Sequence, residues 1–128
     1  MLQVTDELER AETEFKLAID LNPNYANAYQ NFGSLLIETG RTEDGIQALR
    51  RAIAIQPNHA QAFANLAAGL NIQSQHQDAA EAARRALEIA PDLADAPNNL
   101  GAALRALGDH AGAETAYRRA VALDPTHS

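Results

Sequence analysis

Asparagine recurs every 34 residues, at Asn31, Asn65 and Asn99. A side-chain amide has two N–H donors and one carbonyl acceptor, so it can bond both the N–H and the C=O of an extended peptide. Further polar or small residues lie one helical turn away in the same periods, at Asn27, Ser34, Gln61 and Asp95. Together these residues predict a binding row that holds the backbone of a partner and reads little of its sequence.

Histidine is the other residue type here with obvious chemistry. His76 and His110 share one position of the 34-residue period, and His59 and His127 share another. Such positions are separated by about one repeating unit, too far for a single ion held at about 2 Å from each ligand. No nucleophile elbow, phosphate loop, zinc-protease helix or dinucleotide fingerprint is present. The sequence therefore predicts no metal, no cofactor and no catalysis by this chain.

Three arginine pairs follow the same period, at Arg50-Arg51, Arg84-Arg85 and Arg118-Arg119. One interpretation is an electropositive ridge. The other is a solvated face on which the arginine stems shield apolar neighbours and the head groups pair with Glu81, Glu88 or Glu114. The formal charge of −7 and the lack of interleaved aromatic residues favour the second interpretation and argue against nucleic acid as a partner.

The elements that position these residues are helices in pairs. Four prolines lie 34 residues apart, at Pro23, Pro57, Pro91 and Pro125. Each is expected to end one helix, and the next residue is expected to cap the following one: Asn24, Asn58, Asp92 or Thr126. A second break lies about half a period later, at Gly40, Ser74 and Gly108. No segment alternates as a strand does, so the fold class is all-α and each period is a helix–turn–helix unit.

Apolar and small residues repeat within the unit as well. The first helix of a unit carries stripes such as Phe32, Gly33 and Leu36 at helical spacing, and in the second helix Ala18, Ala52, Ala86 and Ala120 share one position. Length, order and residue type resemble the tetratricopeptide repeat (TPR) over essentially the whole chain. The resemblance implies a right-handed α–α superhelical solenoid of about three and a half repeats, or seven helices. The predicted division of this single array, 1–128, is a lone second helix at 5–25 and complete repeats at 26–59, 60–93 and 94–127.

One position departs from the pattern. Pro97 stands where the other units have Tyr29 and Phe63, in or just beyond the first turn of a helix. Because proline lacks a backbone N–H, this helix is expected to start late.

In TPR proteins the polar side of the first helices lines a concave groove. The resemblance therefore places the binding row in such a groove, where it is similar to the asparagine ladder in the TPR domain of O-linked N-acetylglucosamine transferase. TPR domains that grip chaperone C-termini carry Lys and Arg in these positions. Here the positions hold amides and Asp95, which argues against capture of a carboxylate.

Three functional hypotheses follow. The first is a protein-interaction scaffold that holds an extended peptide or partner segment in the amide-lined groove. The second is self-assembly through uncapped ends, with Leu8 and Phe15 at one end and Tyr117 and Val121 at the other. The third is the substrate-recruiting arm of a larger enzyme. The uncapped ends also suggest part of a longer array.

The cellular location is predicted from two kinds of segment that the sequence lacks. No basic segment followed by an apolar stretch opens the sequence, and no apolar run approaches the roughly 18–20 residues that span a bilayer. These features predict a cytoplasmic chain that does not bind membranes.

Overall fold

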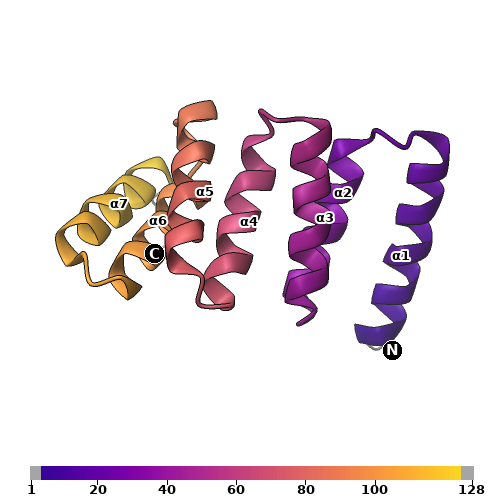
Figure 1. The fold of residues 1–128 in the computed structure, drawn as a ribbon, viewed down its shortest axis with the longest axis horizontal. Helices are drawn as coiled ribbons and strands as arrows, with labels where there is room; N and C mark the ends of the chain where they lie inside the picture. The colour runs from indigo at the N-terminus through magenta and orange to yellow at the C-terminus, as the bar shows by residue number, and fades with distance from the viewer. Residues whose placement is uncertain (1–3, 125–128) are drawn as a thin grey trace. The chain divides into compact units, whose positions relative to one another are not determined.

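The computed structural model describes residues 4–124, and these residues form seven helices and no strand (Figure 1). The helices are α1 (Val4–Leu21), α2 (Ala26–Glu38), α3 (Thr42–Ile55), α4 (Ala60–Ile72), α5 (His76–Ile89), α6 (Asp95–Ala106) and α7 (His110–Leu123). The predicted fold class is confirmed in the number and order of its helices.

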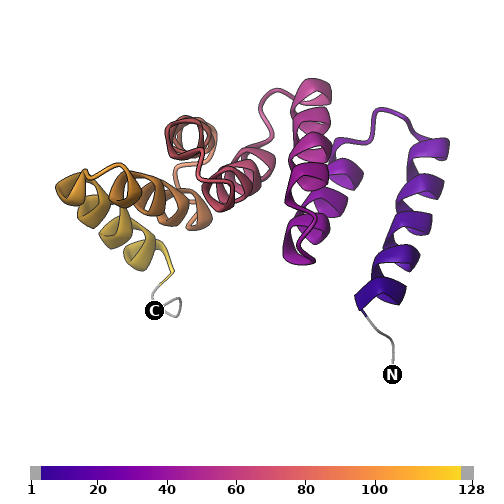
Figure 2. The same cartoon turned by 60° about the horizontal axis from the view of Figure 1, so that its bottom comes forward.

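The chain divides into two compact units after Pro57. Within residues 4–57, α2 packs against α3, and α1 packs more lightly against α2. Within residues 58–124, α4 pairs with α5 and α6 pairs with α7, while α6 also packs against both α4 and α5. Each pair is a helix–turn–helix (Figure 2). The second unit thus contains a helix, α4, that lies against two others.

Pro23, Pro57 and Pro91 each lie in a turn that precedes the next helix, and these turns place the helix starts later than predicted. The backbone N–H of Tyr25 donates to the carbonyl of Asn22 at 3.1 Å, so that Pro23 and Asn24 fill the centre of this turn. Proline suits the first central position because its φ is fixed. The prediction that the residue after the proline caps the next helix is therefore wrong for Asn24, as it is for Asn58 and Asp92. The capping positions lie further on, at Tyr25, His59 and Ala94. Thr126 lies outside the described residues.

The short turns inside the helix pairs share one geometry. Gly40 and Gly108 have a φ of 90°, and Ser74 has a φ of 62°. The residue after each closes the turn with a bond to the preceding helix, as when Arg41 N–H donates to the Leu36 carbonyl at 2.8 Å. This is the Schellman pattern, in which a left-handed residue satisfies the last carbonyls of a helix. The predicted breaks at these three positions are confirmed.

Glycine allows the closest helix crossing in the first unit. A Cβ on Gly45 would lie 2.7 Å from the Gly33 carbonyl oxygen, and a Cβ on Gly33 would lie 2.9 Å from Leu49 Cγ. Only a bare backbone fits at both positions. Leu49, which is fully buried, fills the space beside the crossing.

Pro97 lies in the first turn of α6 and is buried. α6 begins at Asp95, one residue later in its period than α2 at Ala26 and α4 at Ala60. The expected late start is confirmed. Over the described part of the chain, none of the helices is both long enough and apolar enough to cross a membrane.

Candidate functional site

Three residues of the predicted row come together in the second unit. Gln61 lies in the first turn of α4, and its Nε2 donates to Asn65 Oδ1 at 2.9 Å and to Asp95 Oδ2 at 3.2 Å. The hydrogen bonds therefore link two successive first helices, α4 and α6. Asp95 is exposed and Gln61 and Asn65 are half-buried, so the set forms a polar surface that still has unused donors and acceptors.

Asn99, one turn after Asp95, faces a neighbouring helix. Its Nδ2 donates to the backbone carbonyl of Ala64 in α4 at 2.9 Å. The backbone carbonyl of Asn99 accepts a hydrogen bond from Asn71 Nδ2 at 3.1 Å. The side chain thus holds α6 against α4. One amide hydrogen and the side-chain oxygen remain for other partners.

The other three residues of the row lie on α2, in the first unit. Asn27 and Asn31 are exposed, and Ser34 is half-buried. Their spacing of four and three residues places them on one side of α2. Asn31 occupies the same position of the period as Asn99, but no first helix precedes α2 in the described part of the chain.

Asn31 lies in a hollow between α1 and α2, which we call the α1–α2 hollow. Its volume is about 340 Å³. Its walls are formed mainly by Ala11, Phe15 and Ala18 of α1 and by Ala28, Phe32 and Leu35 of α2.

Two of the residues that line this hollow, Phe15 and Phe32, belong to an aromatic cluster. The ring of Phe15 stacks on Phe32 with centroids 4.5 Å apart and meets Tyr29 edge-on at 4.9 Å. Such pairs add about 0.5–1.5 kcal/mol beyond the area they bury. The sequence prediction missed this cluster. The signal was present, because Phe15 stands where the second helices α5 and α7 carry Ala83 and Tyr117.

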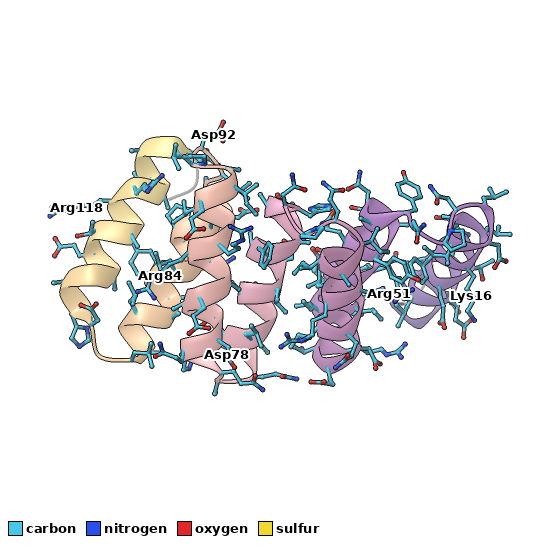
Figure 3. All side chains as sticks on the ribbon, turned by 45° about the horizontal axis from the view of Figure 1, so that its top comes forward. Lys16, Arg51, Asp78, Arg84, Asp92 and Arg118 are labelled. Atoms are coloured by element: carbon cyan, nitrogen blue, oxygen red, sulfur yellow. The ribbon has the colours of Figure 1, made fainter. Side chains whose placement is uncertain are left out.

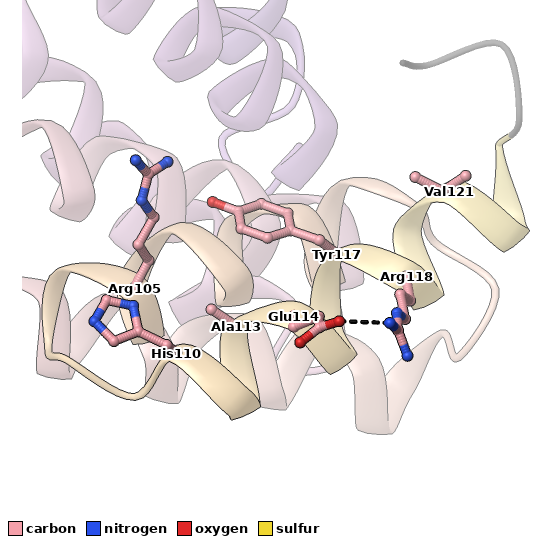
Figure 4. A pocket seen from close by; sticks show the side chains of 7 residues that line it. All are labelled: Arg105, His110, Ala113, Glu114, Tyr117, Arg118 and Val121. Atoms are coloured by element: carbon pink, nitrogen blue, oxygen red, sulfur yellow. Dashed lines mark hydrogen bonds and ion pairs between the residues drawn. The ribbon is translucent and has the colours of Figure 1, made fainter.

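A second hollow, of about 490 Å³, lies on α6 and α7 (Figure 4). Its lining consists of Arg105, His110, Ala113, Glu114, Tyr117, Arg118 and Val121. Val121 is 50% exposed, and Glu114 pairs with Arg118 beside it. This α6–α7 hollow includes both residues predicted for the uncapped C-terminal end, Tyr117 and Val121.

Two family models match this architecture. A model of the tetratricopeptide repeat matches residues 6–70, half of the chain, and a second model of the same repeat matches residues 94–127. The chain belongs to the tetratricopeptide repeat family. TPR domains are typically non-catalytic modules that bind proteins, and this chain is a protein-interaction scaffold of that class.

Solved structures agree with the TPR fold. The crystal structure of MamA superposes with a TM-score of 0.79 at 22% identity and covers 99% of this chain and 78% of that one. A crystal structure of the MamA protein gives a TM-score of 0.77 at 25% identity, over 96% of this chain and 65% of that one. A comparison with curated proteins gave no significant match.

The arginine pairs on the second TPR helices are engaged with the protein itself. Arg85 pairs with Glu88 at 3.0 Å and lies over the Phe63 ring, 6.0 Å from its centroid. Arg51 lies over Tyr29 at the same distance. Figure 3 marks Arg51, Arg84 and Arg118 on α3, α5 and α7. The predicted solvated face is confirmed at Glu88 and at Glu114, the partner of Arg118.

His59 and His76 make local hydrogen bonds within the TPR array. The buried His59 caps α4, where its Nδ1 accepts the backbone N–H of Ala62 at 3.2 Å. Burial lowers the pKa of His59 below its usual value of 6.5, and a backbone hydrogen bond opposes this shift. His76 Nδ1 lies 3.0 Å from Asn71 Oδ1. His127 lies outside the described residues.

Proposed function

We propose that this TPR scaffold binds an extended segment of a partner protein along the exposed side of its first helices, in a concave, amide-lined groove. The hydrogen-bonded set of Gln61, Asn65 and Asp95 is the observation that supports the proposal most strongly. It fixes amide and carboxylate groups in position before a ligand arrives, which lowers the entropy cost of binding. Asn99 lies one turn after Asp95 on α6, and Asn27, Asn31 and Ser34 offer the same kind of polar group on α2 of the first unit.

The chemistry of the row favours a peptide backbone over a charged group. Its only formal charge is Asp95, so an anionic tail gains no ion pair, whereas backbone N–H and C=O groups find acceptors and donors at every amide. We therefore expect binding that depends on an extended conformation and tolerates many side chains.

The test is selection of peptides from a random display library on the intact chain, followed by affinity measurement on variants. We expect Gln61→Ala combined with Asn65→Ala to weaken the selected peptides at least tenfold. The matched control is Arg84→Ala on the second helix, which should leave affinity unchanged. If the double variant and the parent chain bind the selected peptides with equal affinity, the proposed groove is refuted.

Self-assembly through the chain ends is the second candidate, because the ends carry exposed apolar side chains. Leu17 is 60% exposed and Leu21 is 89% exposed on α1, and Val121 borders the α6–α7 hollow. Under this proposal, light scattering shows an association that rises with concentration and is abolished by Val121→Glu. A monomer at every concentration removes it. The third candidate, recruitment of substrates for a larger enzyme, would use the same amide row.

A further inference from the structure

The first helices of the second unit, α4 and α6, contain only two charged side chains, Asp95 and Arg105. Asp95 is the first residue of α6 and Arg105 lies in its last turn, so about 15 Å of helix separates them. Exposed charges that far apart are largely screened at physiological ionic strength, where the screening length is about 8 Å. Within residues 4–124, none of the ion pairs includes Asp95. Asp95 is therefore a negative charge that neither an ion pair nor Arg105 neutralises.

The carboxylate of Asp95 is held by a neutral partner. Its Oδ2 accepts a hydrogen bond from Gln61 Nε2 at 3.2 Å, and Asn65 Oδ1 takes the second hydrogen of Nε2 at 2.9 Å. Both donors of Gln61 are thus in use, and its side chain has only an oxygen left for a ligand. An ionised carboxylate accepts about four hydrogen bonds and donates none, so Asp95 also has acceptor sites left. Gln61 and Asp95 together form a place that accepts hydrogen bonds and carries a negative charge.

We propose that this place, which we call the Gln61–Asp95 acceptor site, binds the cationic side chain of an arginine or lysine in the extended partner segment. The inference rests on the proposed groove and deepens it, because it adds one position at which a side chain of the partner is recognised. Guanidinium and ammonium groups have donors only, which matches a site that offers acceptors only. Arginine fits best, since two of its N–H groups can bind a carboxylate in parallel.

Asn65 lies beside the acceptor site and supplies the opposite kind of group. Its Oδ1 accepts from Gln61, and among the described residues Nδ2 has no acceptor, so both of its hydrogens are left for a ligand. A backbone carbonyl of the partner can bind Asn65 while a neighbouring side chain reaches Asp95. The main chain of the segment is then held as elsewhere in the groove, and its positive charge is recognised separately.

This chain offers no suitable segment of its own. All ten lysines and arginines of the sequence lie among the described residues, and all except Arg41 belong to helices. Arg41 pairs with Asp44 at 2.6 Å. A second copy of the chain thus presents no lysine or arginine on an extended segment, and we assign the segment to a different protein. The net charge of −7 favours the approach of a cationic segment.

The test uses the peptides that a random display library yields on the intact chain. We expect most of them to carry arginine or lysine at one shared position. Replacing that residue by glutamine should weaken binding about two- to fivefold, the range of an exposed ion pair, and by less at high salt. On the Asp95→Asn variant the same replacement should have no effect. Asparagine still accepts the bond from Gln61, but it carries no charge.

Asp78→Asn is the matched control. Asp78 is also an exposed aspartate in the first turn of a helix, but it lies on α5, a second helix. The variant therefore changes the net charge and the interaction with a helix dipole as Asp95→Asn does. It should keep the preference for the basic residue, whereas Asp95→Lys should select peptides with aspartate or glutamate at the shared position. Circular dichroism verifies that each variant is folded.

The outcomes separate this inference from the groove on which it rests. Selected peptides that need Gln61 and Asn65 but share no basic position would overturn the inference and leave the groove intact. A preference that persists in Asp95→Asn, or that disappears in Asp78→Asn, would also overturn it, because the charge would then be recognised elsewhere or by the chain as a whole. If the library yields no peptides, or if they bind the Gln61→Ala and Asn65→Ala double variant normally, the groove is refuted and this inference with it.

Discussion

Residues 4–57 and residues 58–124 share the helix order α1–α2–α3 and α5–α6–α7, but α1 packs more lightly against α2 than α5 does against α6, and the side chains between them differ. In the second unit the helices beneath α4 contribute Ala79, Ala83, Ala86 and Ala96, each with 0% of its surface exposed, and Leu87 and Leu93 pack beside this cluster. In the first unit the corresponding place is lined by aromatic rings and remains open. Small residues suit a surface covered closely by a helix, whereas large rings cover one another where no such helix lies.

The difference teaches how one repeat pattern yields both a core and a surface. Asn99 and Asn31 are the same residue at the same position of the period, yet one is half-buried against a carbonyl and the other is exposed. The neighbouring helix, not the local sequence, decides which role the side chain takes. Point variants in each unit probe this contrast.

The largest effect is expected where the first unit relies on one large side chain. Leu49 is fully buried, and one period later the same position holds Ala83 in α5 of the second unit. Leu49→Ala should destabilise the first unit by about 2–5 kcal/mol, because it leaves a cavity beside Gly33. Hydrogen exchange resolved by segment should show faster exchange in α2 and α3.

The reverse exchange tests the second unit. Ala83→Leu overpacks a closed interior and should cost about 1–3 kcal/mol, with faster exchange in α5 and α6. If Ala83→Leu were neutral, the second unit would have spare volume, and its contrast with the open first unit would fail.

The two asparagines give the next effect. Asn99→Ala removes the hydrogen bond that ties α6 to the Ala64 carbonyl of α4 and should destabilise the protein by about 0.5–1.5 kcal/mol in urea unfolding. Asn31→Ala removes an exposed side chain and should change stability by less than about 0.5 kcal/mol. Equal losses for the two variants would mean that Asn31 already has a structural partner.

The features of the fold that follow the 34-residue period could be predicted from the sequence. Proline and glycine spacing located the helix pairs, and the lone second helix at the N-terminus was found as α1, Val4–Leu21. Helix starts were less predictable. Residues such as Asn24, which have the side chain of a helix cap, lie inside the proline turn, so the capping position is a later residue such as Tyr25.

The candidate site was predictable in residue type but not in role. The period placed Gln61 and Asp95 on successive first helices, and the structure joins them by a hydrogen bond. The 34-residue period could not predict that the Asn99 side chain would bond α4, because this bond depends on how closely α6 approaches Ala64. The residue division 26–59, 60–93 and 94–127 stays a prediction.

A pH effect is expected in the second unit, because His59 caps α4 through an unprotonated Nδ1. Burial lowers the pKa of His59, so below its usual value of 6.5 the unfolded chain binds a proton that the folded chain resists. Stability should therefore fall as the pH drops through 6.5 toward the lowered pKa and level off below it.

His59→Asn is the matched variant for this effect. Asparagine accepts the capping bond without titrating, so the variant should remove this component of the pH dependence. Urea unfolding between pH 5 and pH 8 measures it. An unchanged pH profile in the variant would show that another group is responsible.

The smallest effect is expected in a turn of the second unit, where Ser74 takes the place that Gly40 has in the first unit. Ser74 has a φ of 62° at the position held by Gly40 and Gly108, and an L side chain is strained in this left-handed region. Ser74→Gly should raise the free energy of unfolding by about 0.5–1 kcal/mol, since relief of strain exceeds the added entropy of the unfolded chain. Gly40→Ser in the first unit should lower it by a similar amount. The opposite effects of Ser74→Gly and Gly40→Ser are expected only if the two turns are equivalent. Their backbone hydrogen bonds predict this, because Gln75 N–H donates to the Leu70 carbonyl at 2.8 Å, as Arg41 N–H does to the Leu36 carbonyl. If Ser74→Gly were destabilising, the serine side chain would be making a contact that outweighs its backbone strain, and the units would differ in their turns as well as in their interiors.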